Sequence, residues 1–155
     1  MNRLLFCFAI IIFTVSSITA QNKEAYKFEE LVAGNCEAAW SIIDQYVGEI
    51  RKDSAAKGYI IFYGGKTYDF YEKPKTRLPK RGEAEFRARI AESRLKWLGE
   101  DLNRYVVVNG GYREKFTFEF WVVPAGAETP KPTPTIEADE IKYRKGKPKG
   151  DLWGC

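Results

Sequence analysis

The chain has 155 residues, with 25 lysines or arginines, 21 aspartates or glutamates and no histidine. The absence of histidine excludes catalytic triads that use it and metal sites with histidine ligands. A net charge of +4 is too small to argue for a nucleic-acid partner, and we expect no metal ion and no cofactor.

The first 20 residues are predicted to be a secretory signal peptide. A short basic start, Met1–Arg3, precedes the apolar run Leu4–Val15, and the small polar segment Ser16–Ala20 ends at a plausible cleavage site. The apolar run is short for a membrane span, which needs roughly 20 residues. We therefore expect a secreted or periplasmic protein that keeps no stable membrane span after cleavage near Ala20.

The first half of the mature chain predicts a strand, a helix and a second strand. Ala25–Leu31 is the first strand, and Asn35 is a good N-cap for a helix over Cys36–Arg51. Apolar residues recur at helical spacing within it: Trp40, Ile43, Val47 and Ile50. The apolar run Tyr59–Tyr63 is the second strand, and it ends in two glycines, Gly64 and Gly65.

A charged segment then leads into the strongest predicted helix. Lys66–Arg81 contains Pro74 and Pro79 and is predicted to be a loop. Gly82–Leu98 is predicted to be helical, with Gly99 as its C-terminal glycine.

Two further strands complete the predicted domain. Tyr105–Val108 is followed by a turn at Gly110 and Gly111, and Lys115–Val123 should then pair antiparallel to Tyr105–Val108. In the last strand Phe116, Phe118 and Phe120 alternate with polar or amphipathic residues, as expected for a sheet with one face on a core.

The remaining residues are predicted to lie outside the domain of residues 21–123. Residues 124–135 are rich in proline and should form an extended, unpacked linker. Residues 136–155 form a basic tail, for which we consider both a solvated segment and electrostatic contact with an anionic envelope polymer. Cys36 and Cys155 could form a disulfide in an oxidising compartment, or remain one buried and one exposed thiol.

The strand–helix–strand unit indicates an α+β fold of order β-α-β-α-β-β, with helices on one face of a mixed sheet. Such crossovers are right-handed and leave their two strands parallel, so both glycine pairs should emerge at one edge. Neither pair continues as a phosphate-binding motif. We interpret them as turn glycines that end the two parallel strands.

The second helix places charged residues on its inward arc. Its apolar stripes leave Glu83, Arg87 and Arg94 between them, and a buried arginine is costly unless it is paired. Either the arginine stems snorkel to solvent, or Arg87 is directed at an anionic ligand or a carboxylate partner.

These residues resemble the OmpA-like domain of bacterial envelope proteins. Arg87-Ala88 matches the Arg-Ala pair of that family's second helix, Gly99 follows at the family's spacing, and Gly111 matches its turn glycine. The chain also resembles secreted bacterial proteins of unknown function with the same Gly-Gly…Gly-Gly-Tyr-Arg layout.

The resemblance implies a peptidoglycan-binding domain in which an aspartate and the helix arginine hold the charged end of a diaminopimelate residue. The arginine corresponds to Arg87, whereas the family's aspartate position is Thr67 here, with Asp69 two residues further on. The implied ligand-binding residues are listed together: Arg87, Asp69, Thr67, Gly65 and Gly111.

Three functions are compatible with the sequence. The first is an envelope binding domain that grips peptidoglycan through Arg87 and the displaced Asp69. The second is a degenerate OmpA-like domain that serves as a structural or protein-interaction module. The third is a small hydrolase built on Asp69 and Glu72, which we consider the weakest, so we expect no enzymatic activity.

Overall fold

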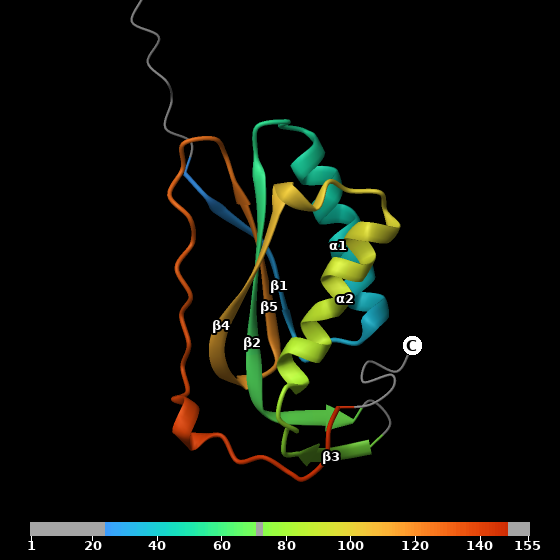
Figure 1. Cartoon of the computed structure of the whole chain (residues 1–155), viewed down its shortest axis with the longest axis vertical. Helices are drawn as coiled ribbons and strands as arrows, with labels where there is room; N and C mark the ends of the chain where they lie inside the picture. The colour runs from blue at the N-terminus through green and yellow to red at the C-terminus, as the bar shows by residue number, and fades with distance from the viewer. Residues whose placement is uncertain (1–23, 71–72, 149–155) are drawn as a thin grey trace, which may run out of the picture.

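The computed structural model describes residues 24–70 and 73–148 of the chain. Within them the fold is α+β, with a five-stranded open sheet and two α-helices (Figure 1). The elements are β1 (Tyr26–Val32), α1 (Cys36–Arg51), β2 (Lys57–Phe70), β3 (Lys73–Arg77), α2 (Glu83–Trp97), β4 (Tyr105–Lys115) and β5 (Thr117–Val123), with short 3-10 turns η1 (Leu102–Arg104) and η2 (Ala138–Glu140).

The sheet is mixed, and β2 is its longest and most connected strand. β5 lies antiparallel between β1 and β2, while β4 pairs with β2 in parallel and β3 pairs with the far end of β2. The predicted parallel crossover and the α+β class are confirmed. The predicted pairing of the last strand with Tyr105–Val108 is wrong, because the phenylalanine-rich β5 is buried in the middle of the sheet instead.

Both helices cover one face of this sheet, as predicted (Figure 1). α1 has the predicted bounds, and the Asn35 side chain caps it by accepting a hydrogen bond from the Ala38 amide at 2.9 Å. Its inward face fixes the helix to the sheet, since the Tyr46 hydroxyl donates to the Trp121 carbonyl at 2.6 Å. Tyr46 belongs to a core cluster that includes these fully buried aromatic and aliphatic residues: Ile43, Ile50, Ile60, Phe118 and Phe120.

The glycine pairs do not end their strands, which corrects the prediction of turns. β2 continues from Gly65 to Phe70, and β4 continues from Gly111 to Lys115. The predicted loop 66–81 therefore contains the end of β2 and all of β3, which form a hairpin. At Gly65 a β-carbon would lie 2.6 Å from the Phe116 amide nitrogen, so close backbone approach requires the glycine.

The proline-rich segment packs on the sheet, contrary to the predicted free linker. Residues 124–141, which we call the strap, run along the sheet face opposite the helices (Figure 1). The Thr133 amide donates to the Tyr63 hydroxyl at 3.1 Å, and the Thr135 amide donates to the Tyr112 carbonyl at 3.0 Å. The strap thus covers a face that the period-two alternation of β5 assigned to solvent.

Glu119 lies on that covered face and is 2% exposed. One carboxylate oxygen accepts from Lys27 at 2.7 Å and Arg113 at 2.8 Å, and the other accepts from Tyr63 and Trp121 at 3.1 Å each. Burial alone would raise the pKa of Glu119, but the hydrogen bonds from Lys27, Arg113 and Trp121 and the charge of Arg113 lower it to about 2. Arg113 also donates to the Thr133 hydroxyl at 2.8 Å, which connects the carboxylate to the strap.

We predict opposite effects from two glycine-to-alanine substitutions. Gly65→Ala should lower the free energy of unfolding by roughly 2 kcal/mol or more, because its methyl group meets backbone atoms that cannot move away cheaply. Gly48→Ala, in α1 with open space around it, should raise that free energy by up to about 1 kcal/mol. Urea unfolding of both variants measures the two signs, and an unchanged or raised stability in Gly65→Ala would contradict the packing argument.

We also predict that Glu119 makes the fold sensitive to acid. The folded pKa of about 2 lies below the ordinary value of 4.5, so the carboxylate's stabilisation is complete above about pH 4.5. It is lost as the pH falls toward 2, and it amounts to roughly 3 kcal/mol. Urea unfolding of the wild type and Glu119→Gln across this range should show their stabilities converging at low pH. A constant offset between the two proteins would refute the assignment.

Candidate functional site

Arg87 lies on the inward face of α2 and is 7% exposed, so the predicted burial of this arginine is confirmed. Its Nε is 3.5 Å from Oε1 of Glu83, one turn earlier on the same helix. Arg77 of β3 approaches the same carboxylate with both terminal nitrogens, one of them 2.9 Å from Oε2. The Lys80 amide donates to Oε2 as well, at 2.9 Å. We call Arg77, Glu83 and Arg87 the arginine–glutamate cluster.

Aromatic rings line this cluster and keep it away from water. The Arg87 guanidinium lies 4.6 Å from the ring centroid of Tyr68 and 5.8 Å from that of Phe116. The Arg77 guanidinium lies 5.3 Å from the Tyr68 ring. Cation–π attraction is strongest where the cation is desolvated, so these rings stabilise both charges inside the fold.

The carboxylate of Glu83 stays ionised despite complete burial of its side chain. Burial alone would raise its pKa, but the hydrogen bonds from Arg77 and the Lys80 amide, with the charges of Arg77 and Arg87, lower the pKa below its usual value. Glu83 is therefore the negative centre between two arginines, and it joins α2 to β3 and to the segment between them.

The structure brings together only part of the predicted ligand-binding set. Gly65 and Arg87 meet at Tyr68, because the Tyr68 hydroxyl accepts from the Gly65 amide at 3.3 Å. Thr67 pairs with Lys115 of β4. Gly111 has a φ of +93° and borders Pro134 of the strap. Asp69 pairs with Thr76 along the backbone of the hairpin, and its side chain lies outside the described part of the structure.

Other predicted residues also fall outside the description. Glu72, Cys155 and the side chain of Cys36 are not among the described groups, so the disulfide stays a prediction. Arg94, predicted on the inward arc, instead bridges the two helices. Its Nε donates to Asp44 of α1 at 2.7 Å, and its guanidinium lies 4.2 Å from the ring centroid of Trp97.

The surroundings of Arg87 were not predicted from the sequence. Glu83 precedes Arg87 by four residues on one helix, which is the spacing of an intrahelical ion pair and could have indicated the contact. Nothing in the sequence indicated Arg77 or Tyr68, because the segment that contains them was predicted to be a loop. Their roles follow from the β2–β3 hairpin, which places both beside the start of α2.

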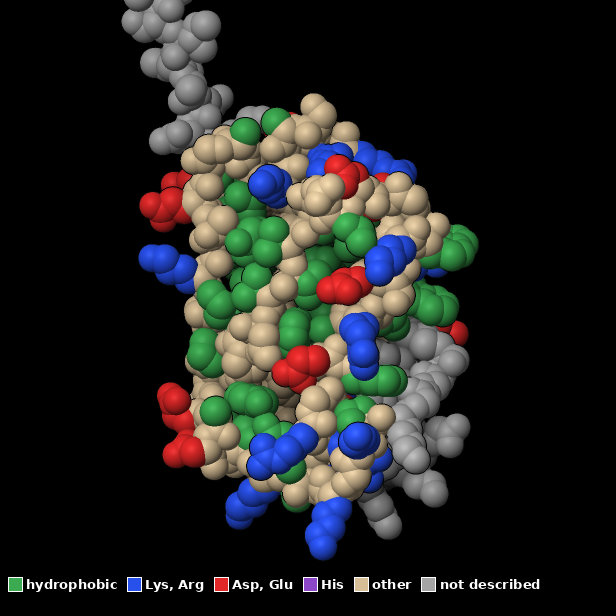
Figure 2. Space-filling view, viewed as in Figure 1, with side chains coloured by type: hydrophobic (Ala, Val, Ile, Leu, Met, Phe, Trp, Pro, Cys, Tyr) green, Lys and Arg blue, Asp and Glu red, His purple; other side chains and the backbone are tan. Residues whose placement is uncertain are grey.

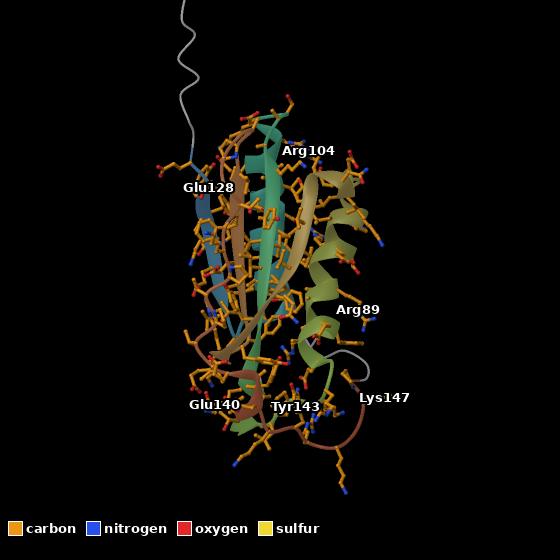
Figure 3. The ribbon with its side chains drawn as sticks, turned by 60° about the vertical axis from the view of Figure 1, so that its left-hand side comes forward. Arg89, Arg104, Glu128, Glu140, Tyr143 and Lys147 are labelled. Atoms are coloured by element: carbon orange, nitrogen blue, oxygen red, sulfur yellow. The ribbon has the colours of Figure 1, made fainter. Side chains whose placement is uncertain are left out.

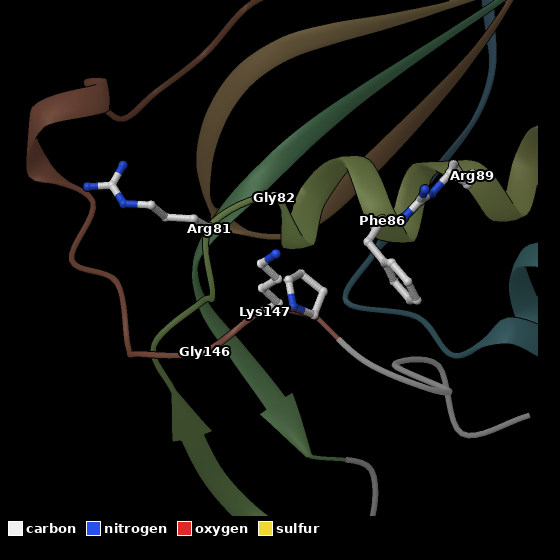
Figure 4. Close-up of a pocket in the computed structure, with 7 residues that line it drawn as sticks. Arg81, Gly82, Phe86, Arg89, Gly146 and Lys147 are labelled. Carbon is white, nitrogen blue, oxygen red and sulfur yellow. The ribbon is translucent and has the colours of Figure 1, made fainter.

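A second feature lies near the arginine–glutamate cluster, at the start of α2. A pocket is lined by Arg81, Gly82, Phe86, Arg89, Gly146, Lys147 and Pro148, and we call it the basic pocket (Figure 4). It lies between the first turns of α2 and residues 146–148 near the C-terminus. Three of the lining residues are cationic and none is acidic, so the arrangement favours an anionic ligand.

Comparison of the chain with family models, curated proteins and solved structures finds no match in any of the three. Within residues 24–70 and 73–148, no helix is long and apolar enough to cross a membrane. The same residues contain no group of three or more potential metal ligands.

We predict that Glu83→Gln destabilises the protein strongly. Removing the carboxylate charge leaves two buried guanidinium groups close together, and breaking a buried pair costs roughly 3 kcal/mol or more. Glu92→Gln is the matched control, since it makes the same change at an exposed position of the same helix. Thermal and urea unfolding of both variants measure the difference, and equal stabilities would show that the cluster does not support the fold.

Proposed function

We propose that this protein is a secreted, envelope-associated interaction domain without enzymatic activity, in which Arg87 supports the fold instead of gripping a cell-wall peptide. The observation that supports this proposal is the carboxylate of Glu83. Its Oε1 lies 3.5 Å from Nε of Arg87, and the Glu83 side chain is fully buried beside the nearly buried arginine. In a peptidoglycan-binding domain, the arginine would pair with the charged end of a diaminopimelate residue. Here the Glu83 carboxylate of the protein itself takes the place of that ligand group.

The chemistry of the cluster supports this role. Guanidinium groups pair well with carboxylates in fork geometry. Glu83 accepts such a pair of contacts from Arg77, and it is also attracted by the nearby charge of Arg87. A ligand carboxylate would have to compete with an internal partner that is already desolvated. Such competition costs binding free energy, because the internal pair must be broken first.

Peptidoglycan binding through Arg87 and a displaced acidic residue is the second candidate. The contact of Arg87 with the Tyr68 ring favours it, because the hydroxyl of that ring accepts from Gly65. Two of the predicted ligand-binding residues therefore meet at one aromatic side chain. Asp69 directly follows Tyr68 in the chain and would supply the acid.

Cosedimentation with purified diaminopimelate-containing peptidoglycan decides between the two candidates. We expect the wild type, Arg87→Ala and the control Lys96→Ala, an exposed cation of the same helix outside the basic pocket, to remain in the supernatant to the same extent. Pelleting of the wild type and Lys96→Ala, with loss of pelleting in a folded Arg87→Ala, would establish the second candidate.

A second measurement covers the outcome in which Arg87→Ala does not fold. A soluble stem peptide that contains diaminopimelate can be titrated into the wild type while the arginine side-chain NMR signals are followed. We expect no saturable shift of the Arg87 signal, because its guanidinium is paired inside the fold. A saturable shift would overturn the proposal without any substitution.

A further inference from the structure

The C-terminal tail folds back onto the start of α2 instead of extending into solvent. The Arg144 amide donates to the Pro79 carbonyl at 2.9 Å, and Lys80 Nζ donates to the Lys147 carbonyl at 3.1 Å. The hydroxyl groups of Tyr112 and Tyr143 lie 2.9 Å apart, and Ile141 is 6% exposed. Residues 141–147 are therefore attached to the domain at several points.

This attachment gathers positive charge at one end of the molecule. Figure 2 shows lysine and arginine side chains at that end, and Figure 3 places Tyr143 and Lys147 there, with Arg89 on the adjoining helix and Arg104 at the opposite end. We call the following residues the basic end: Lys80, Arg81, Arg89, Arg144, Lys145 and Lys147. All except the half-buried Lys80 are exposed.

The contacts within the basic end involve backbone and aromatic groups. The Arg81 guanidinium lies 4.6 Å from the Tyr143 ring centroid, and the Arg89 guanidinium lies 4.8 Å from that of Phe86. The nearby Glu85 accepts a hydrogen bond from Asn109 of β4 at 3.1 Å. The tail is thus attached through carbonyl, amide and hydroxyl groups, and its attachment brings like charges together.

Such a concentration of like charge opposes folding and has no role in the core, since these side chains are exposed. An anion that binds across the basic end would relieve the repulsion. Four to eight lysines and arginines in one patch are typical of contact with anionic lipid headgroups, and lysine pairs with phosphate as a compact point charge.

We propose that the basic end binds the phosphate groups of an anionic phospholipid surface, with the basic pocket holding one headgroup. In Figure 3 Lys147 lies toward one end of the molecule and Arg89 lies farther along α2, and the basic pocket brings Arg81, Arg89 and Lys147 together. One headgroup in this pocket can therefore contact α2 and the tail at the same time. The inference rests on the proposed envelope association. It names the partner of that association and is independent of Arg87.

Vesicle flotation of the exported chain tests the inference. Vesicles of phosphatidylglycerol mixed with phosphatidylcholine should bind the protein at low salt, whereas vesicles of phosphatidylcholine alone should not. The triple variant Arg89→Gln, Lys145→Gln, Lys147→Gln should bind the anionic vesicles roughly a hundredfold more weakly. Binding of the wild type should also fall as salt is raised, because salt screens exposed charges.

The control variant removes three exposed lysines outside the basic end: Lys57→Gln, Lys96→Gln and Lys131→Gln. It has the same net charge as the test variant and should bind about as well as the wild type. Absence of vesicle binding, or equal losses in the two variants, would overturn the inference. Binding to soluble polyphosphate without binding to vesicles would also overturn it, and would assign the site to a soluble polyanion.

The outcome is separable from that of the proposed function. A protein that binds anionic vesicles and also pellets with peptidoglycan through Arg87 would refute the proposed role of Arg87 and leave the basic end intact. A protein that binds neither would refute the basic end alone. Thermal unfolding of both triple variants confirms that the substitutions leave the fold in place, as expected for exposed side chains.

Discussion

The packing of the β2–β3 hairpin against the start of α2 depends on the carboxylate of Glu83. It is fully buried, yet it stays ionised because Arg77, Arg87 and the Lys80 amide surround it. These contacts join the β2–β3 hairpin to the first turn of α2. Removal of water strengthens each attraction and also raises the free-energy cost of losing any one partner. Strand β3, helix α2 and the segment between them are therefore held in one arrangement.

A second buried carboxylate organises the opposite face of the sheet. Glu119 binds Lys27 of β1 and Arg113 of β4, and Arg113 reaches on to Thr133 of the strap. Strand β5, which contributes Glu119, is thereby tied to its neighbour β1, across β2 to β4, and to the C-terminal segment. Both carboxylates are satisfied by donors from different elements, which makes them effective in specifying a single packing of the chain.

The strap and the C-terminal tail add a covered sheet face and a basic end to the domain. Neither feature is part of the hydrophobic core. Thr133 docks on Tyr63, and further along the chain Arg144 docks on Pro79. This path covers the sheet first and then places the basic residues beside α2. The same backbone hydrogen bonds that complete the fold therefore create the charged surface for which we propose an anionic membrane partner.

The sequence by itself determined the elements whose signals are local. The cap at Asn35 and the helical spacing after it located α1, and the spacing of α2 placed Arg87 on a buried face. It could not determine that Glu119 is buried. The period-two alternation predicts only one face of β5 on the core, and Glu119 lies on the other face, which the strap covers in the structure. The glycines at 65 and 111 were interpreted as turns, because the sequence alone does not show that Gly65 permits close backbone approach or that Gly111 has a positive φ within a continuing strand. Only the tertiary structure decided what surrounds Arg87, because Tyr68 reaches its guanidinium and Arg77 reaches the shared carboxylate of Glu83 through the β2–β3 hairpin. The prolines and charges of that segment had predicted a loop.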